Sequence, residues 1–255
     1  MKVVIIGSGN AATVLGRRIA ESGHPILQVF SRSREHAGRL ASTLGCPFCT
    51  EWAEISRDGE LYLVALSDHV LLSLAGRLSL PGKLVVHTAG AISRDVLMSV
   101  SENYGVLYPL QSLRATISSI PAIPLLVDAR HPADQQRIMD FARTISGQVE
   151  AADDATRLKL HLASVVVNNF SNHLYVLAAE FCNREGIRFD LLLPLIRETA
   201  ERLSFADPRK AQTGPAARGD EPTIEKHLRL LDNYKDIKEL YQLFTVQIEQ
   251  LNRDK

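Results

Sequence analysis

An unbroken apolar run followed at once by a glycine-rich turn constrains the fold more than any other feature of the chain. The run, Val3 to Ile6, contains no polar residue, which is typical of a parallel strand buried on both faces. The turn, Gly7 to Ala12, reads Gly-Ser-Gly-Asn-Ala-Ala, and apolar residues then recur at helical spacing as far as Ile19. The sequence therefore predicts a strand, a tight turn and a helix in direct succession.

The turn fits the pattern G-x-G-x-x-A, in which each small residue has a separate task. Gly7 permits the tight turn, Gly9 lets the backbone approach a pyrophosphate, and Ala12 lets the helix pack closely on the strand. The first N–H groups of the helix then point at the anion. We expect this loop to bind a dinucleotide through Gly7, Ser8, Gly9, Asn10 and Ala11.

The alternation of strands and helices continues through the first 152 residues. Further strands are expected over residues 26–30, 61–66, 84–87, 106–108 and 125–127, with amphipathic helices over residues 37–44, 70–75 and 138–145. Strands that alternate with helices of this length make a parallel α/β sheet with right-handed crossovers. We predict a Rossmann dinucleotide-binding domain over residues 1–152.

The pattern changes after Asp153 and Asp154. Residues 155–185 contain neither Gly nor Pro and keep a helical period, so one long helix is expected, ending at Gly186. Three more helices are expected, one capped by Asp190 and running to Leu203, and two near residues 223–231 and 235–251. Residues 153–255 are therefore predicted to form an all-helical domain.

The end of the second predicted strand decides which dinucleotide fits. NAD enzymes usually place Asp or Glu about 20 residues after the glycine loop, to accept a hydrogen bond from the ribose 2′-hydroxyl. This chain has Ser31-Arg32-Ser33-Arg34 there, without a carboxylate that would repel a 2′-phosphate. We predict NADP as the cofactor, with Ser31 and Arg32 as contacts; the alternative is a solvated basic loop.

Composition excludes several classes of partner. The 29 basic and 29 acidic residues cancel, so no overall charge draws the protein to nucleic acid or to an anionic membrane. No apolar run approaches the roughly 20 residues that span a bilayer. The N-terminus lacks the features of a signal peptide, so a cytoplasmic protein is expected.

The three cysteines, Cys46, Cys49 and Cys182, are too few for a disulfide scaffold. Cys46 and Cys49 form a C-x-x-C pair, but one pair with no second Cys or His pair nearby cannot complete a tetrahedral zinc site. We predict no metal site and reduced thiols, with a thiol–disulfide role as the alternative.

Four further segments carry a resemblance to a known family: Val86 to Ala91, Tyr108 to Gln111, Leu160 to Leu174, and Thr213 to Asp220. Over nearly all 255 residues the chain resembles a bacterial family of NADP-binding, Rossmann-like proteins with a helical domain of unknown function. That family belongs to the wider group of enzymes like 6-phosphogluconate dehydrogenase, pyrroline-carboxylate reductase and ketopantoate reductase. The resemblance implies no particular substrate.

The resemblance implies a layout for the active site. The nicotinamide would lie over the carboxyl ends of the strands, near Leu66, Ser67 and Thr88, with the substrate between it and the long helix. Several relatives use a Lys and an Asn further along that helix to donate a proton to a carbonyl and orient it.

The long helix of this chain departs from the Lys and Asn pattern. His161, Ser164, Asn168 and Asn172 are three or four residues apart and share one helical face, whereas Lys159 lies roughly 200° around the helix from His161. We predict His161 as the proton donor, Asn168 as the orienting catalytic residue, Asn172 as a substrate contact and Lys159 in solvent. The alternative is a polar face that packs on a helix of a partner subunit.

Other candidates for substrate binding lie outside this helix. His87 and Gln111 are expected at strand ends, where ligands of open α/β sheets gather. Arg218 offers a planar fork for a carboxylate or phosphate, while Asp220 either pairs with it or caps the next helix. His227 is a weaker candidate for the same cleft, and His173 is expected to be structural.

Together these features predict an NADP-dependent oxidoreductase that passes hydride between the nicotinamide and a small carbonyl, imine or alcohol carbon. The alternative is a non-catalytic NADP(H)-binding redox sensor or regulatory protein. The long helix carries more apolar residues than a small helical domain easily covers, among them Val166, Phe170 and Leu174. We therefore also predict a homodimer formed through the helical domain.

Overall fold

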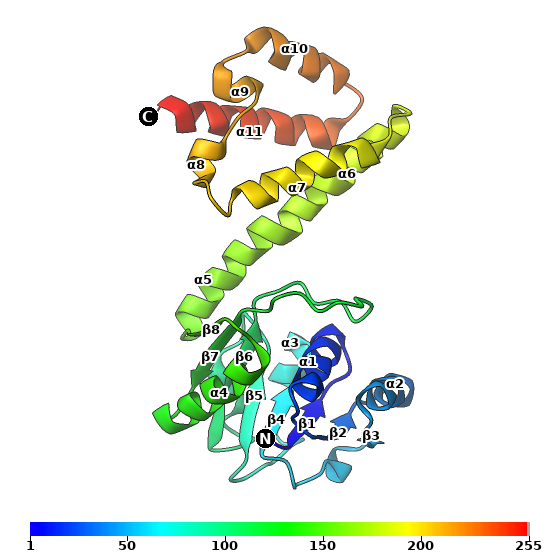
Figure 1. Cartoon of the computed structure of the whole chain (residues 1–255), viewed down its shortest axis with the longest axis vertical. Coiled ribbons are helices and arrows are strands. Elements are labelled where there is room, and N and C mark those ends of the chain that lie inside the picture. The colour runs from blue at the N-terminus through cyan, green and yellow to red at the C-terminus, as the bar shows by residue number, and fades with distance from the viewer. Residues whose placement is uncertain (254–255) are drawn as a thin grey trace. The chain divides into compact units, whose positions relative to one another are not determined.

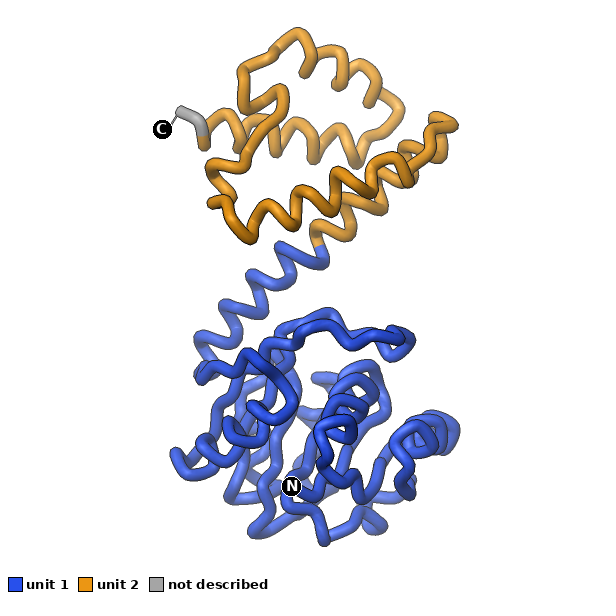
Figure 2. The backbone as a smooth tube through the Cα atoms, viewed as in Figure 1, with its two compact units in different colours: residues 1–169 blue, residues 170–255 orange. Residues whose placement is uncertain are grey.

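The computed structural model describes residues 1–253 and divides the chain into two compact units (Figures 1 and 2). The first unit covers residues 1–169, and the second begins at Phe170. The predicted boundary at residue 152 lies where the secondary structure changes, because the last strand ends at Ala151 and the next helix begins at Asp154. It stays a prediction, since the compact units divide further along the chain.

The first unit is built on one eight-stranded sheet in the order β3-β2-β1-β4-β5-β6-β7-β8. Neighbouring strands are parallel except β6 and β7, which are antiparallel. The strands are β1 Val3–Ile6, β2 Ile26–Phe30, β3 Phe48–Cys49, β4 Leu61–Val64, β5 Leu84–His87, β6 Asn103–Pro109, β7 Leu125–Ala129 and β8 Val149–Ala151. The predicted Rossmann-like α/β fold is confirmed.

Helices cover both faces of this sheet because the apolar strands alternate their side chains. Val3 and Ile5 pack with buried residues of α1 Asn10–Glu21, α2 Arg34–Leu44 and α4 Pro132–Ile145. Val4 and Ile6 point to the opposite face, where they pack with α3 Asp68–Leu72 and the segment that follows it. The strand order reverses between β1 and β4, and ligands of open α/β sheets bind beside such a point.

Two glycines make the first strand–helix unit compact. Gly7 has a φ of +127°, and a Cβ there would lie 2.2 Å from the carbonyl oxygen of Ala65. A Cβ on Gly16 would lie 2.9 Å from Ile5 Cδ1 and 3.0 Å from Leu44 Cδ1. Gly7 therefore needs a residue without a side chain, because the backbone at Ala65 leaves no room, whereas a Cβ at Gly16 would meet only the ends of two flexible side chains.

The long helix predicted after Asp153 is present, but it is not α-helical throughout. It consists of α5 Asp154–Ser164, a π-helical turn Val165–Phe170 and α6 Ser171–Arg184. Asp153 caps its start by accepting a hydrogen bond from the backbone N–H of Thr156. A π-helical turn takes up one more residue than an α-helical turn, so simple α-helical spacing does not hold across it.

The second unit contains further helices: α7 Leu193–Arg202, α8 Pro208–Ala211, α9 Pro215–Arg218, α10 Glu221–Leu230 and α11 Lys235–Arg253. The expected cap at Asp190 is wrong, because residues 189–192 form a 3-10 turn in which Asp190 pairs with Arg188, and α7 begins only at Leu193. Across residues 1–253, no helix combines the length and apolar character that crossing a membrane requires.

Candidate functional site

A cavity of about 660 Å³ opens at the turn between β1 and α1. Seven residues predicted to bind the cofactor line it: Gly7, Ser8, Gly9, Ser31, Arg32, Leu66 and Ser67. The ends of β1, β2 and β4 meet at this edge because all three strands run in the same direction. The structure thus brings together residues that are up to 60 positions apart in the chain.

The start of α1 suits an anion in this cavity. Gly9 is the N-cap residue, and within residues 1–253 no side chain caps this helix and no acidic residue lies in its first turn. A Cβ on Gly9 would meet no described protein atom within 4 Å, so the backbone here is open to a ligand. Free N–H groups and the positive end of the helix dipole favour a phosphate at this position.

Hydroxyl and basic side chains lie at the β2 end of the cavity. Ser8 Oγ donates a hydrogen bond to Ser31 Oγ over 2.7 Å, and Arg32 and Ser33 line the same wall. Arg34, the second arginine of the segment, instead lies over the Phe48 ring, with its Cζ atom 5.6 Å from the ring centroid. Arg32 is therefore the arginine of this segment that faces the cavity.

Six lining residues were not among the predicted cofactor contacts: Phe30, Ser33, His36, Trp52, Ala65 and Val70. Trp52 packs on Phe30 with ring centroids 4.2 Å apart, so an aromatic pair forms part of the wall. Ser33 directly follows the predicted contacts Ser31 and Arg32, and His36 lies three residues further on, so closeness in sequence was the available signal. Trp52 lies in a separate short helical turn, and no sequence spacing connects it to the glycine loop.

Three other predicted cofactor residues have different surroundings. Asn10 Oδ1 accepts a hydrogen bond from the backbone N–H of Ala115 over 2.9 Å, which ties the loop after β6 to the start of α1. Thr88 uses its backbone N–H to bond the carbonyl of Val64. Contacts of Asn10, Ala11 and Thr88 with a cofactor stay predictions.

A second cavity of the first unit, about 580 Å³ in volume, lies between the end of β6 and the long helix. Its lining includes three residues predicted from the sequence, His161, Asn168 and Gln111, and the hydroxyl-bearing side chains of Tyr108 and Ser164. Asn169, which α-helical spacing did not select, also lines it. Asn168 and Asn169 both belong to the π-helical turn.

His161 is held on this cavity wall by contacts from other elements. Its Nδ1 lies 2.9 Å from the Tyr108 hydroxyl, and the two rings meet edge to face. A Cβ on Gly90 would lie 2.7 Å from the same Nδ1, so the chain after β5 also fits closely against the imidazole. Lys159 is exposed, as its position on the helix predicted.

An ion-pair cluster anchors the helix one turn before His161. Arg157 is only 1% exposed and donates to Asp154 and to the Ile92 carbonyl, each over 2.6 Å. Asp154 also accepts from the backbone N–H of Arg94, whose side chain pairs with buried Asp128. These contacts join α5 to the segment after β5 and to β7, and they set where His161 lies.

Two other predicted substrate contacts, His87 and Gln111, have different surroundings. His87 is 0% exposed and its Nδ1 accepts from the Ala89 N–H, so it belongs to the interior, and a substrate contact by His87 stays a prediction. Burial and the nearby charge of Arg157 lower the pKa of His87 to about 4. Gln111 reaches its cavity, but its side chain also bonds Ala122 and Ser112.

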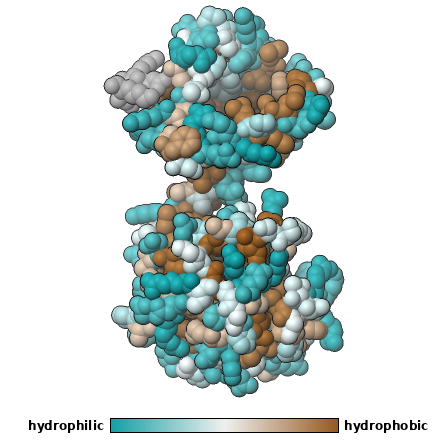
Figure 3. Space-filling view, viewed as in Figure 1, coloured by the Kyte–Doolittle hydropathy of each residue, from teal (hydrophilic) through white to brown (hydrophobic). Residues whose placement is uncertain are grey.

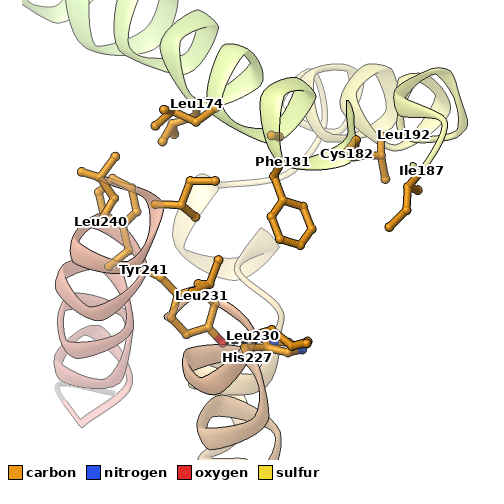
Figure 4. A pocket seen from close by; sticks show the side chains of 14 residues that line it. Leu174, Phe181, Cys182, Ile187, Leu192, His227, Leu230, Leu231, Leu240 and Tyr241 are labelled. Atoms are coloured by element: carbon orange, nitrogen blue, oxygen red, sulfur yellow. Dashed lines mark hydrogen bonds between the residues drawn. The ribbon is translucent and has the colours of Figure 1, made fainter. Parts of the chain in front are cut away.

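The second unit carries Asn172, Arg218 and His227. Asn172 and Arg218 are exposed, and Asp220 caps α10 through the Thr223 N–H rather than pairing directly with Arg218. His227 Nδ1 lies 2.9 Å from the Tyr241 hydroxyl at a third cavity of about 590 Å³, whose walls are otherwise almost entirely apolar (Figure 4). Substrate contacts by Asn172 and Arg218 stay predictions.

The C-x-x-C pair does not have the properties of a reactive dithiol. All three cysteines are free, and burial raises the pKa of Cys46. Burial and the nearby Glu54 and Glu51 carboxylates raise the pKa of Cys49 to about 11. The thiolate, which is the reactive form, is therefore disfavoured.

Comparisons with known proteins agree with this architecture. Residues 2–90 match the family model described as "NADP oxidoreductase coenzyme F420-dependent", and residues 123–248 match a domain of unknown function, DUF2520. No curated protein matches the sequence.

Solved structures extend the likeness to whole chains. A protein from Bacteroides fragilis, provisionally named an NADP oxidoreductase, is 38% identical over 98% of each chain, with a TM-score of 0.89. A 1-pyrroline-5-carboxylate reductase from Streptococcus pyogenes is 15% identical over 98% of each chain, with a TM-score of 0.66. An imine reductase from Myxococcus stipitatus, solved with NADP⁺, is 14% identical over 100% of this chain and 95% of its own, with a TM-score of 0.65.

The last two likenesses are shared folds, whereas the first is close enough to show a common family. The chain belongs to the family of NADP oxidoreductase-type Rossmann proteins that carry a DUF2520 helical domain.

Proposed function

We propose that this protein is an NADP-dependent oxidoreductase acting on a small carbonyl, imine or alcohol substrate. The observation that carries the proposal is the cavity that His161 shares with Asn168, because it joins a proton-transfer group to an amide that can orient a substrate. The same unit holds a cavity of about 660 Å³ at the glycine loop. The structural neighbours named for reduction of imines and of pyrroline carboxylate support this substrate class.

The residues of the glycine-loop cavity fit NADP(H). Gly9 and the first N–H groups of α1 would bind the pyrophosphate, with Asn10 and Ala11 contributing their backbone. Ser31, Arg32 and Ser33 would bind the 2′-phosphate. Leu66, Ser67 and Thr88 would lie toward the nicotinamide, which supplies or accepts a hydride when bound.

The chain's own chemistry at the substrate is the transfer of one proton. His161 would supply that proton during reduction and remove it during oxidation, while Asn168 would hold the reacting oxygen or nitrogen. The described lining of this cavity is uncharged apart from any charge His161 itself carries, which favours a neutral reacting group. We propose Asn172 as a further contact and Arg218 as the anchor for any anionic tail.

We also propose a homodimer formed through the helical unit. Large apolar side chains are exposed on it, including Leu195, Phe205 and Leu230, and brown patches mark apolar surface in Figure 3. Apolar surface of this extent usually marks an interface. The cytoplasmic location expected from the sequence stays a prediction.

The test is turnover of NADPH with a panel of small aldehydes, ketones and cyclic imines, followed by the reverse reaction with alcohols and NADP⁺. His161→Ala should lower kcat by about 10²- to 10⁴-fold, because a positioned acid–base group contributes that much. NADPH affinity, measured by fluorescence, should not change.

Lys159→Ala is the matched control, since it removes an exposed basic side chain from the same helix and should leave turnover nearly unchanged. NADPH binding without turnover on any member of the panel would favour the redox-sensor alternative. Turnover that depends on Lys159 and not on His161 would contradict the assignment of the proton donor.

A further inference from the structure

Tyr108 and His161 form a polar pair between two separate elements of the first unit. Tyr108 lies near the end of β6 and is 8% exposed as a residue, and its hydroxyl oxygen lies 2.9 Å from His161 Nδ1. Both residues line the same cavity. Since Nδ1 is occupied by this bond, Nε2 is the ring nitrogen of His161 that remains for a molecule in the cavity.

The tyrosine hydroxyl keeps its proton in this setting. Burial raises the pKa of Tyr108, and this effect exceeds the lowering by the Ser164 hydroxyl and by the charge of Arg157. A neutral imidazole has one N–H and one nitrogen that only accepts. A phenol O–H that donates to Nδ1 therefore requires the imidazole proton to be on Nε2.

The neighbours of the pair hold this geometry. Gly90 leaves just enough room, because a Cβ there would come within 2.7 Å of His161 Nδ1 and 3.0 Å of Tyr108 Cε2. On the helix side, Arg157 fixes the preceding turn through Asp154 and Ile92. The imidazole thus has little freedom to turn its other nitrogen toward Tyr108.

We propose that Tyr108 is a positioning residue that donates its hydroxyl hydrogen to His161 Nδ1 and so holds the imidazole proton on Nε2, facing the substrate cavity. This inference rests on the proposed function, in which His161 transfers a proton to the substrate. It adds that the tautomer is set by a tyrosine from the sheet. When the proton leaves Nε2, the Tyr108 hydroxyl proton passes to Nδ1, so the imidazole stays neutral and the tyrosine regains a proton from solvent; oxidation runs the same transfers in reverse.

The decisive experiment is ¹⁵N NMR of the full chain with labelled histidine, at a pH where His161 is neutral. The two ring nitrogens have well-separated shifts according to which carries hydrogen, and His161→Ala identifies the signals of His161. Wild type should show hydrogen on Nε2. Tyr108→Phe, which removes only the hydroxyl, should shift His161 toward a mixture of tautomers and lower kcat about 10-fold without changing NADPH affinity.

Tyr104→Phe is the matched control. Tyr104 is a buried tyrosine on the same strand, and its hydroxyl bonds Asp95 over 2.9 Å, away from the cavity. Its loss should leave the His161 signals unchanged. Gly90→Ala gives a second, independent perturbation, and it should also disturb the tautomer because its Cβ presses on Nδ1.

The outcomes separate this inference from the proposed function. Hydrogen on Nδ1 in wild type, or His161 signals unaffected by Tyr108→Phe, would overturn the role of Tyr108 whatever the activity. Unchanged turnover in His161→Ala would instead refute His161 as the proton donor. The NMR result would still decide whether Tyr108 sets the tautomer of His161.

Discussion

Arg32 is the side chain on which we propose that the preference between the two nicotinamide dinucleotides depends. It lines the glycine-loop cavity beside Ser31, whereas the neighbouring Arg34 lies over Phe48. A guanidinium can bind a 2′-phosphate through two charge-assisted hydrogen bonds, but it offers no acceptor to a ribose hydroxyl. The position of one side chain therefore determines the specificity expected at this end of the cofactor.

Arg32→Asp should weaken NADPH binding by about 1.5–3 kcal/mol, roughly 10- to 150-fold in Kd, because a charge-assisted hydrogen bond is replaced by repulsion. NADH binding should change little, so the ratio of the two affinities should fall or reverse in a fluorescence titration. Arg34→Asp is the control and should have a much smaller effect. An unchanged ratio in Arg32→Asp would contradict the assignment of the 2′-phosphate site.

Burial of His87 makes the stability of the fold depend on pH. Its pKa is about 4 in the folded chain, below the ordinary value of 6.5, because burial disfavours the charged ring. The unfolded chain therefore binds the proton first as pH falls. The contribution of neutral His87 to the free energy of unfolding is complete above pH 6.5 and is lost as the pH falls from there toward 4.

Between pH 7.5 and pH 5, protonation of His87 in the unfolded chain should lower the free energy of unfolding of the wild-type protein by about 2 kcal/mol. His87→Asn keeps an acceptor for the Ala89 N–H but does not titrate. Urea unfolding should show a shallower pH dependence for this variant by about that amount. Parallel curves for the two proteins would show that His87 titrates normally in the fold.

Two helices carry most of the groups to which we assign a function, and each of these helices is irregular where those groups lie. α1 begins without a side-chain cap, which leaves its first N–H groups for a ligand. The long helix contains a π-helical turn, which brings both Asn168 and Asn169 to the cavity that His161 lines. π-helical turns are rare in proteins, and those that occur lie frequently at functional sites.

Gly9→Val should abolish dinucleotide binding while leaving the fold intact. Gly9 has an ordinary φ of −79° and open space at its Cβ position, so the fold tolerates a side chain that a pyrophosphate would not. Gly147→Val is the control, because its Cβ position is also open and it lies between α4 and β8. Calorimetry measures the NADPH affinity of both variants. Near-normal affinity in folded Gly9→Val would show that the nucleotide binds elsewhere.

At the scale of the whole molecule, the two units have different kinds of interior. The first buries its apolar strands between helices on both faces, while the second leaves an apolar cavity lined by side chains such as Leu174, Phe181 and Phe244 (Figure 4). A helical unit with this much uncovered apolar surface is stabilised when a second copy covers it.

Leu230→Glu should weaken the proposed homodimer, because Leu230 lines that cavity and is 67% exposed. Light scattering at micromolar concentration should give a dimer for wild type and a smaller species for the variant. Leu72→Glu, at a leucine of the first unit that is 63% exposed, should remain dimeric. A wild-type monomer would refute the dimer.

Local patterns in the sequence were enough to determine six strands of the sheet, the glycine loop and the extent of the long helix, but not the short strands β3 and β8 or the antiparallel pairing of β6 with β7. An apolar run buried on both faces, a turn that only glycine can make and a helical period are set by neighbouring residues, so they can be recognised without tertiary contacts. Seven of the predicted cofactor contacts line one cavity, which follows from the same reasoning because parallel strands end at one edge. The short helices α8 and α9 lack such a pattern and were missed.

Only the tertiary structure decided which polar groups meet. His87 and Gln111 were equivalent as residues at strand ends, yet one is buried and the other lines a cavity. Tyr108 pairs with His161 although 53 positions separate them, and Gly90 closes on both. The periodicity of apolar residues indicates which face of an element is buried. Contacts between polar side chains depend instead on strand order, helix phase and the π-helical turn, because these are set by packing over the whole unit.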